Sequence, residues 1–236
     1  MYTHTSIRAD QVRRTTVPTR DVSYAPGTPR DGVHSTLAEQ MQVMGAVMSY
    51  PRNVEIFGEN EPAEYLYHVV SGCVRTYKIL SDGRRQVGGF YLPGDIFGLE
   101  FTDEHTLSAE TIADTKVLVV KRSALDSLCS RNISIAQDLF ALTGRELQRA
   151  QDRILLLIKS AQERVASFLL EMSERVAGSN AIELPMSRQD IADYLGLTIE
   201  TVSRTLTSLE TCAAIEVPTS RRIVLRNRSA LNQLNG

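Results

Sequence analysis

The hydrophobic pattern of the chain is most regular between residues 133 and 159, where apolar positions follow a helical period. Phe140, Leu147 and Ile154 recur every seven residues, and further positions fall between them at spacings of three and four. This pattern resembles a coiled-coil seam, and a helix of about 27 residues is about 40 Å long. Packing within one chain would explain the apolar face but not that length, so we expect a dimer seam. Its positions are Phe140, Thr143, Leu147, Ala150, Ile154, Leu157 and Ala161.

Short β-rich runs fill the region between Asn53 and Lys121, and glycines separate them. Runs of this length between turn residues predict an antiparallel barrel or sandwich. The clearest hairpin joins "VRTYKIL" to "RRQVGGFYL" through Ser81, Asp82 and Gly83. Asp-Gly favours a tight primed turn, which needs positive φ angles, so we expect the tip of the hairpin there.

The chain around this β region contains shorter elements. Residues 1–34 are rich in Thr, Arg and Pro without a hydrophobic period, which predicts a flexible tail. Thr36 and Glu39 match a capping box and predict a short helix. We expect its apolar stripe to comprise Leu37, Met41, Met44 and Met48. A last strand, "KVLVV", and a short helix near residues 123–128 precede the long helix.

The C-terminal part predicts two helices joined by a glycine turn. After a helix from Gln162 to about Val176, a second capping box, Ser187 with Asp190, opens another helix that ends at Gly196. Thr198 then caps the next helix. This spacing is that of a helix-turn-helix, whose second helix enters the major groove of DNA.

The two faces of that second helix differ in chemistry. Val202, Leu206 and Leu209 share one face, and the opposite face carries Glu200, Ser203, Arg204 and Thr207. Arg can donate two hydrogen bonds to guanine and Glu can accept one from cytosine, so we expect base contacts from Glu200, Ser203 and Arg204. An i, i+4 ion pair between the Glu and the Arg, worth about 0.3–0.5 kcal/mol, is a compatible alternative.

Other polar residues near this helix are candidates for contacts to the DNA backbone. The segment "AAIEVPTSRRIVLRN" predicts a two-stranded wing with Arg221 and Arg222 at its tip, where they could contact phosphates. A solvated hairpin without DNA contacts is an equal alternative. The backbone or supporting candidates are Ser187, Thr198, Thr201, Thr207, Arg221 and Arg222.

The composition of the chain excludes some classes of protein but does not by itself indicate a function. The 236 residues carry a formal charge of −2, with 26 Lys and Arg against 28 Asp and Glu, so bulk charge does not indicate a nucleic-acid partner. The longest apolar run, "ILLLI", is far below the roughly 20 residues that span a bilayer, and the N-terminus lacks a signal core. We therefore expect a cytoplasmic protein with no membrane partner.

Reactive side chains are few and scattered. The three cysteines, Cys73, Cys129 and Cys212, are widely spaced and form no Cys-x-x-Cys pair, so we expect no metal site. The four histidines are dispersed, and neither Gly-x-Ser-x-Gly nor His-Glu-x-x-His occurs. An enzyme is therefore the weakest interpretation.

From about residue 53 onward the sequence resembles the Crp/Fnr family of bacterial transcription regulators. The segments that carry the resemblance are "YLPGDIFGLE", "QDRILLLIKSAQERVASFLL" and "DIADYLGLTIETVSR". Glu200, Ser203 and Arg204 match the Glu-x-x-Ser-Arg reader of the Fnr and FixK branches, whose half-site is TTGAT. The resemblance implies an α+β fold: a tail (1–34), a jelly-roll barrel like cyclic-nucleotide-binding domains (35–128), a dimerisation helix (129–160) and a winged helix-turn-helix (161–236).

Two departures from the family narrow the expectation. Members that bind cyclic AMP hold its phosphate with an Arg-Ser pair, but this chain has Leu107 before Ser108. Fnr itself holds an iron–sulfur cluster with three N-terminal cysteines and one in the barrel; here the N-terminal region has none, and Val119 takes the barrel position. We therefore expect no cofactor and a FixK-type regulator.

The resemblance implies a homodimeric activator of microaerobic or anaerobic genes that binds palindromes like TTGAT-N4-ATCAA without an obligatory effector. RNA polymerase is a further expected partner, with Ser71, Asp82, Arg84, Arg85 and Thr115 as contact candidates. Cys212, near the reader helix, is a possible redox thiol. The alternatives are an effector-gated or redox-gated regulator of the same family and a sensor module that acts through protein partners without DNA.

Overall fold

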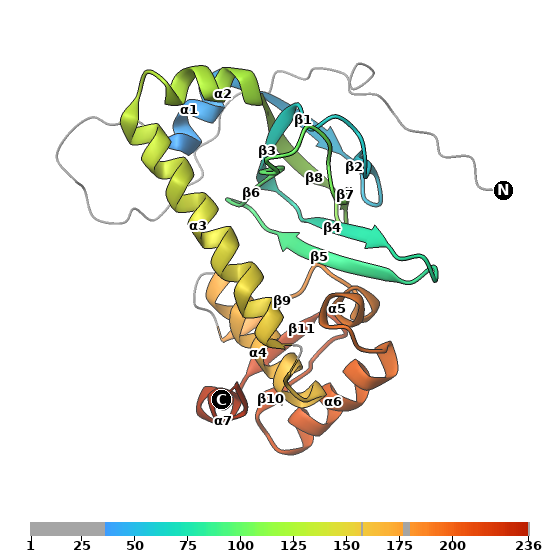
Figure 1. Cartoon of the computed structure of the whole chain (residues 1–236). Helices are drawn as coiled ribbons and strands as arrows, with labels where there is room; N and C mark the ends of the chain where they lie inside the picture. The colour runs from blue at the N-terminus through green and yellow to red at the C-terminus, as the bar shows by residue number, and fades with distance from the viewer. Residues whose placement is uncertain (1–35, 157, 177–179, 236) are drawn as a thin grey trace.

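The computed structural model describes residues 36–156, 158–176 and 180–235, which form a β-rich domain, a long helix and a helical domain with a small sheet (Figure 1). The expected tail, residues 1–34, and the seam residue Leu157 lie outside the described residues. The first domain and its flanking helices are α1 (Leu37–Met44), β1 (Ala46–Tyr50), β2 (Glu55–Phe57), β3 (Tyr65–Ser71), β4 (Val74–Ile79), β5 (Arg85–Tyr91), β6 (Ile96–Phe97), β7 (Ser108–Thr111), β8 (Thr115–Lys121) and α2 (Arg122–Cys129). The following elements are α3 (Ile133–Leu156), α4 (Ala161–Arg175), β9 (Ala181–Glu183), α5 (Arg188–Leu195), α6 (Ile199–Thr211), β10 (Ile215–Glu216), β11 (Arg222–Leu225) and α7 (Arg228–Asn235).

Two four-stranded antiparallel sheets make up the first domain, with strand orders β1-β8-β3-β6 and β2-β7-β4-β5. Their facing sides bury an aromatic core in which Tyr67 packs on Phe57 and Phe97, with ring centroids 5.2 and 5.0 Å apart. Two stacked sheets with one buried face each explain why the strands alternate between buried and exposed residues. The jelly-roll architecture predicted from the sequence is confirmed.

The helix before the barrel is shorter than its apolar stripe suggested. The capping box of Thr36 and Glu39 is present at the start of α1. However, α1 ends at Met44, and Met48 lies in β1, so the prediction that Met48 continues the stripe is wrong. The backbone becomes extended at Gly45 (φ −93°, ψ 169°), the C-cap of α1, and the chain enters β1 directly. A Cβ at this position would lie 2.8 Å from the Leu118 side chain of β8, which favours glycine there.

The β4–β5 hairpin forms where it was predicted but with a different turn. Gly83 has φ 83°, and Asp82 is not among the described residues with positive φ. A two-residue type I′ turn needs positive φ at both central residues, so the expected primed turn is wrong. The loop instead closes with Gly83 N–H donating to Leu80 O at 2.9 Å and Leu80 N–H donating to Arg84 O at 2.8 Å, which is a three-residue loop with one left-handed glycine.

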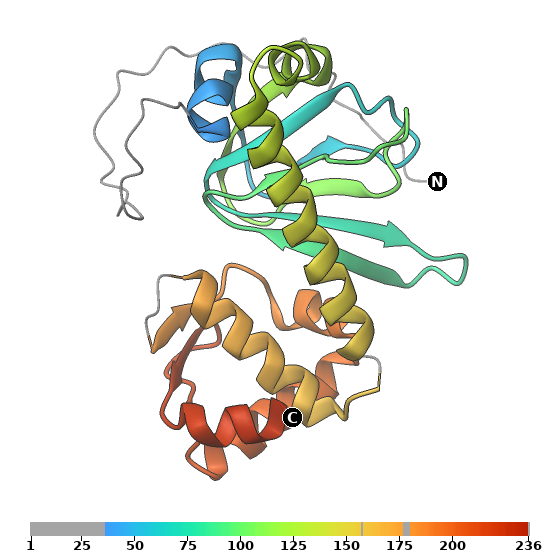
Figure 2. The ribbon, with the colours of Figure 1, turned by 60° about the vertical axis from the view of Figure 1, so that its left-hand side comes forward.

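Helix α3 runs from the barrel to the C-terminal domain (Figures 1 and 2) and begins at Ile133, as predicted. It ends at Leu156, and Ser160 with Glu163 forms a capping box that starts α4 at Ala161. Ala161 is therefore on another helix, and its assignment to the seam of α3 is wrong. The seven-residue period simply continues across this break in the sequence.

The C-terminal domain packs α4, α5, α6 and α7 around one apolar core with a sheet of order β10-β11-β9. The predicted wing strands are β10 and β11, but β9 also pairs with β11, so the sheet has three strands rather than two. The winged helix-turn-helix fold predicted from the sequence is confirmed.

Candidate DNA-binding surface

Local sequence signals hold α5 and α6 at a fixed angle. Ser187 accepts a hydrogen bond from the backbone of Asp190, which closes the capping box at the start of α5. Gly196 ends α5 in the left-handed region with φ 64°, where a side chain would be strained. Thr198 then accepts a hydrogen bond from Thr201 N at 3.2 Å and starts α6. The turn is therefore set by residues that the sequence alone identified.

The inner face of α6 is fully packed. Val202 and Leu209 are 0% exposed and Leu206 is 3% exposed, as predicted. Thr205 is also buried against the same core side of the helix. These contacts leave the opposite face of α6 to meet a partner molecule.

The outer face of α6 carries the predicted base readers. Glu200, Arg204 and Thr207 are exposed and Ser203 is half-buried. Arg204 Nη2 lies 3.5 Å from Thr201 Oγ1, and within the described part of the chain no ion pair joins Arg204 to Glu200. Both side chains thus remain available to base edges in a groove.

The electrostatics at the start of α6 keep Glu200 charged. Its backbone N–H and the hydroxyl of Thr198 donate hydrogen bonds that lower the pKa of the carboxyl, and the charge of Arg204 lowers it further. An ionised carboxylate is a hydrogen-bond acceptor, which is what contact with a cytosine amine requires.

The candidates for backbone contacts lie around α6. Ser187 is half-buried at the start of α5, and its hydroxyl also donates to Asp190 Oδ2 at 2.7 Å. At the turn before β11, the Thr219 hydroxyl accepts from the N–H groups of Arg221 and Arg222 at 3.4 and 3.0 Å. Arg222 is exposed and Arg221 half-buried, and among the described residues neither forms an ion pair. Both guanidinium groups could therefore reach phosphates.

Helix α3 leaves a regular apolar stripe uncovered. Phe140, Leu147 and Ile154 are 80%, 60% and 64% exposed, and Ile133, one heptad earlier, is 76% exposed. The sequence reasoning missed Ile133, although it continues the same period. Thr143 is half-buried and hydrogen-bonds to Leu139 O within the helix, while Ala150 is exposed on the stripe. Large apolar side chains in this arrangement need a partner helix to be buried.

The candidate contacts for RNA polymerase separate into two groups. Ser71 is exposed, and at the hairpin tip the exposed Asp82 and Arg84 form an ion pair of 2.7 Å. Thr115 is 2% exposed, and its hydroxyl donates to Ala113 O at 2.7 Å and accepts from Cys73 N at 3.1 Å. Its role as a surface contact is therefore wrong, because the hydroxyl satisfies buried backbone groups.

Arg85 also differs from the expectation of an exposed contact. Its guanidinium is partly buried and lies 2.8 Å from carboxylate oxygens of both Asp190 and Asp193 on α5. The side chain thus joins the barrel to the helix-turn-helix rather than extending into solvent. Arg85 is therefore not available as an exposed contact for RNA polymerase.

A buried arginine beside it was missed entirely. Arg75 on β4 is 8% exposed and forms ion pairs with Glu110 and Asp190. Burial raises the pKa of Asp190, but hydrogen bonds from Ser187 and the charges of Arg75 and Arg85 outweigh it and hold the pKa below its ordinary value. The carboxylate is therefore ionised at neutral pH and attracts both arginines.

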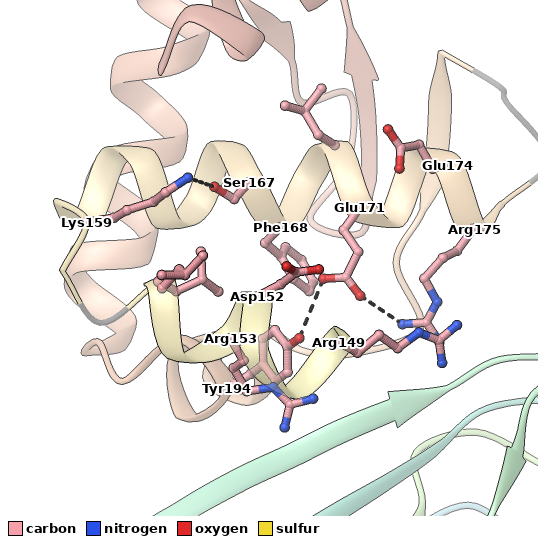
Figure 3. Close-up of a pocket in the computed structure, with 13 residues that line it drawn as sticks. Arg149, Asp152, Arg153, Lys159, Ser167, Phe168, Glu171, Glu174, Arg175 and Tyr194 are labelled. Atoms are coloured by element: carbon pink, nitrogen blue, oxygen red, sulfur yellow. Dashed lines mark hydrogen bonds and ion pairs between the residues drawn. The ribbon is translucent and has the colours of Figure 1, made fainter. Parts of the chain in front are cut away.

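A cleft of about 520 Å³ lies where α3, α4 and α5 meet (Figure 3). Glu171 of α4 accepts from Arg175 Nη1 at 3.2 Å and faces the Tyr194 hydroxyl at 3.5 Å. The guanidinium of Arg153 on α3 lies 5.1 Å from the Tyr194 ring centroid. A cation–π contact thus connects the end of α3 to α5, and a polar contact connects α5 to α4.

In the barrel, Leu107 occupies a place beside Gly88. A Cβ on Gly88 would lie 2.6 Å from Leu107 Cδ1, so the glycine makes room for this apolar side chain. Ser108, the next residue, accepts from Glu59 N at 2.9 Å. An isobutyl group at this position offers a phosphate no hydrogen bond.

The described residues contain no cluster of three or more His, Cys, Asp or Glu side chains suited to a metal ion, and none of their helices is long and apolar enough to span a membrane. Of the thiols, Cys73 is 0% exposed and burial raises its pKa to about 12, whereas Cys212 is exposed at the end of α6. Cys129 is half-buried, so Cys212 is the most accessible of the three thiols, as a redox role requires.

Comparison with known proteins identifies both domains. Residues 47–132 match the cyclic nucleotide-binding domain family and residues 163–234 the Crp-like helix-turn-helix domain family. The chain is 50% identical over 204 residues to the nitrogen fixation regulation protein FixK of Azorhizobium caulinodans, covering 84% of this chain and 82% of that protein. It is 40% identical over 177 residues to the transcriptional activatory protein AadR of Rhodopseudomonas palustris, covering 73% and 74%. The structure of FixK2 from Bradyrhizobium japonicum superposes with a TM-score of 0.79 at 53% identity, covering 82% of this chain and 98% of that one.

Proposed function

Since the chain belongs to the Crp/Fnr family and is a FixK-type transcription regulator with a DNA-binding helix-turn-helix, we propose that it is a homodimer that reads TTGAT-N4-ATCAA palindromes and activates genes for life at low oxygen. Its relatives are transcription regulators rather than enzymes. The name of AadR describes an activator, which supports activation here. The protein acts in the cytoplasm, where it meets DNA and RNA polymerase.

The outer face of α6 carries this proposal. Glu200 and Arg204 are exposed one helical turn apart near the start of the helix, where residues reach deepest into a major groove. The guanidinium can donate two hydrogen bonds to guanine and the carboxylate can accept one from cytosine. Ser203 lies between them on the same face. This combination matches the G·C pair of the TTGAT half-site.

The uncovered stripe of α3 supports the dimer. A two-fold dimer through this stripe carries two copies of α6, and two readers need two half-sites in inverted order. The seam residue Ala150 is small and uncharged, so the close approach of two helices brings no like charges together. Leu147 and Ile154 flank it on the stripe.

Two features favour DNA binding without an obligatory effector. Leu107 stands where cyclic-AMP-binding relatives carry arginine, and its side chain fills the space beside Gly88. Because no charged side chain at Ala150 repels its counterpart on the other helix, no ligand is needed to bring the two α3 helices together. Control then acts on the amount of protein, with promoter-bound dimer recruiting polymerase through Ser71 and the hairpin-tip pair of Asp82 and Arg84.

One observation favours a second candidate, a redox-gated regulator. Cys212 is exposed at the end of the reader helix, so its oxidation would place a polar or bulky group beside α6. In that case DNA binding by the purified protein would fall on mild peroxide treatment and recover with a thiol reductant. A sensor module without DNA would show no shift of the palindrome at all.

Base readout is tested by comparing two arginines. We expect Arg204→Ala to cost about 1–3 kcal/mol at the palindrome and to relax base preference at one position, and Glu200→Ala to behave likewise. Arg222→Ala, the matched control at the wing, should weaken specific and random DNA alike and reduce the salt dependence. Fluorescence anisotropy with the palindrome, single-base variants and random duplex measures all of these affinities. Equal losses on specific and random DNA for Arg204→Ala would exclude its base contact.

A further inference from the structure

We infer that two ion clusters, one buried and one partly buried, fix the helix-turn-helix to the barrel of its own protomer, with Arg85 and Arg75 as positioning residues, and that this attachment sets the half-site spacing that the dimer accepts. The inference rests on the proposed function, because only a dimer on a palindrome has a spacing to set. Figure 1 shows β5 lying directly over α5, where the first cluster forms.

The first cluster is centred on Asp190. Its Oδ1 pairs with Nη1 of Arg75 and lies 2.8 Å from Nη2 of Arg85. Arg75 Nη2 lies 2.8 Å from Glu110 Oε2 on β7, so the barrel holds the guanidinium from its other side. Arg75 and Asp190 are 8% and 5% exposed. Asp190 is also the residue that closes the capping box with Ser187, so the barrel binds the group that starts α5.

The same hairpin contacts α5 one turn later. Arg85 Nε donates to Asp193 Oδ2 at 2.8 Å, while its Nη2 serves Asp190. Gln86 Nε2 donates to Asp193 O at 2.7 Å. Because the two carboxylates are three residues apart, they lie on one face of α5, and a planar guanidinium that binds both fixes the rotation of the helix as well as its position.

The second cluster is centred on Asp95, in the turn between β5 and β6. Arg175 of α4 donates to Asp95 Oδ2 at 2.6 Å and to Phe90 O at 2.7 Å. Arg149 of α3 lies 3.5 Å from Asp95 Oδ1, and Leu92 N donates to Oδ2 at 2.7 Å. The dimerisation helix, the first helix of the C-terminal domain and the barrel therefore meet at one carboxylate.

Apolar contacts lie between the two clusters. The ring of Phe90 on β5 is 5.2 Å from the Tyr194 ring and 6.4 Å from the Phe168 ring, centroid to centroid. Apolar burial holds two surfaces together without a preferred direction, whereas a guanidinium–carboxylate pair has a defined geometry. The apolar contacts thus supply adhesion, and the ion clusters supply orientation.

Orientation matters because α3 and α4 are separate helices rather than one continuous helix. Helix α3 ends at Leu156 and α4 begins at Ala161, so residues 157–160 join them. Each added base pair moves a half-site by about 3.4 Å and turns it by about 35°. A helix-turn-helix held by both clusters can therefore fit one spacer length, whereas one released from the barrel can follow several.

The test reverses the charge of Arg85 and uses its neighbour as a control. In Arg85→Glu, the new carboxylate faces Asp190 and Asp193, and the repulsion should move the hairpin off α5. Arg84→Glu places the same charge one residue away on the exposed tip, where the wild-type side chain pairs with Asp82. The full-length variants are titrated with duplexes that carry the same half-sites at spacers of three, four, five and six base pairs, and with a single half-site.

Wild type and Arg84→Glu should bind the four-base-pair spacer about a hundredfold more tightly than the others, because the avidity of the second half-site is lost when geometry forbids it. Arg85→Glu should reduce that preference to roughly tenfold or less, and adding Asp193→Arg should restore it. If circular dichroism shows that Arg85→Glu does not fold, the neutral variant Arg85→Gln replaces it. This variant should also reduce the preference for the four-base-pair spacer.

Two results overturn the inference in different ways. An Arg85 variant that loses affinity equally for every spacer and keeps the wild-type preference shows that the cluster stabilises the fold without setting the spacing. A wild-type protein that binds a single half-site as tightly as the palindrome contradicts the dimeric reader itself, and with it the premise of this inference.

Discussion

In the proposed dimer, the exposed stripe of α3 makes the strength of association depend on single side chains, of which Leu147 is a central one. Leu147 is 60% exposed in the protomer. Truncation to alanine removes about three carbon groups, each worth about 0.8 kcal/mol when fully buried. A partner helix can cover only the exposed fraction of Leu147, so the truncation removes about 1.4 kcal/mol of dimerisation free energy per protomer. A symmetric dimer loses this contribution in both protomers, so Leu147→Ala should weaken the free energy of dimerisation by about 3 kcal/mol. This corresponds to a roughly hundredfold higher Kd of the dimer.

Sedimentation equilibrium over a range of protein concentrations, without DNA, measures this Kd directly. Leu155→Ala is the matched control, because Leu155 is on the same helix and 56% exposed but lies off the heptad stripe. Its free energy of dimerisation should change by no more than about 0.5 kcal/mol. Circular dichroism confirms that both variants keep their helices. Equal Kd values for Leu147→Ala and wild type would refute the assignment of the stripe as the interface.

Three further outcomes follow from the surface and the buried charges. Arg84→Glu should reduce transcription by purified polymerase while leaving palindrome affinity unchanged; a loss of DNA binding instead would contradict the contact between the hairpin tip and RNA polymerase. Cys212 should react fastest with a thiol reagent in the native protein, the half-buried Cys129 more slowly and Cys73 only after unfolding, because their exposure falls in that order; a native Cys212→Ser protein that keeps the fastest phase would contradict this. The pKa of Asp190 is lowered by folding, so its contribution is present above the ordinary pKa of about 3.9 and is lost as the pH falls through the folded value. Urea unfolding should therefore show a stability gap between wild type and Asp190→Asn that is constant from pH 8 to pH 6 and shrinks below about pH 4; a gap independent of pH down to acid would show that the charge of Asp190 contributes nothing.

Signals confined to a few neighbouring residues were readable from the sequence. The capping boxes at Thr36 and Ser187 and the turn at Gly196 formed where predicted, because each depends on residues within one helical turn. The buried face of α6 followed from its helical period in the same way. The helix boundaries and the two faces of α6 could therefore be predicted from local sequence, whereas the jelly-roll barrel and the order of the domains were implied by the resemblance to the Crp/Fnr family.

Periodicity failed where it continued past an element boundary. Met48 keeps the spacing of α1 but lies in β1, because the backbone becomes extended at Gly45, the C-cap of α1. Ala161 keeps the heptad of α3 but lies in α4, although the Ser160 and Glu163 capping box was a local signal that could have placed the break.

The contacts between the domains could not be predicted from the sequence. Arg75 and Asp190 are 115 residues apart, and nothing in the spacing of either pairs them. Arg85 looked like a neighbour of Arg84 on an exposed tip, yet the alternation of β5 turns it toward α5. The burial of Thr115 could not be predicted because one of its partners, the backbone N–H of Cys73, lies 42 residues away in the sequence.

The central claim is that this protein reads its palindrome unaided as a dimer. The most direct measurement is the selection of bound duplexes from a random pool by aerobically purified, metal-free protein with no small molecule added. We predict that TTGAT-N4-ATCAA is enriched with both half-sites and one spacer length. Enrichment of no sequence, or enrichment that appears only when a cell extract is supplied, would contradict the claim and favour a gated regulator.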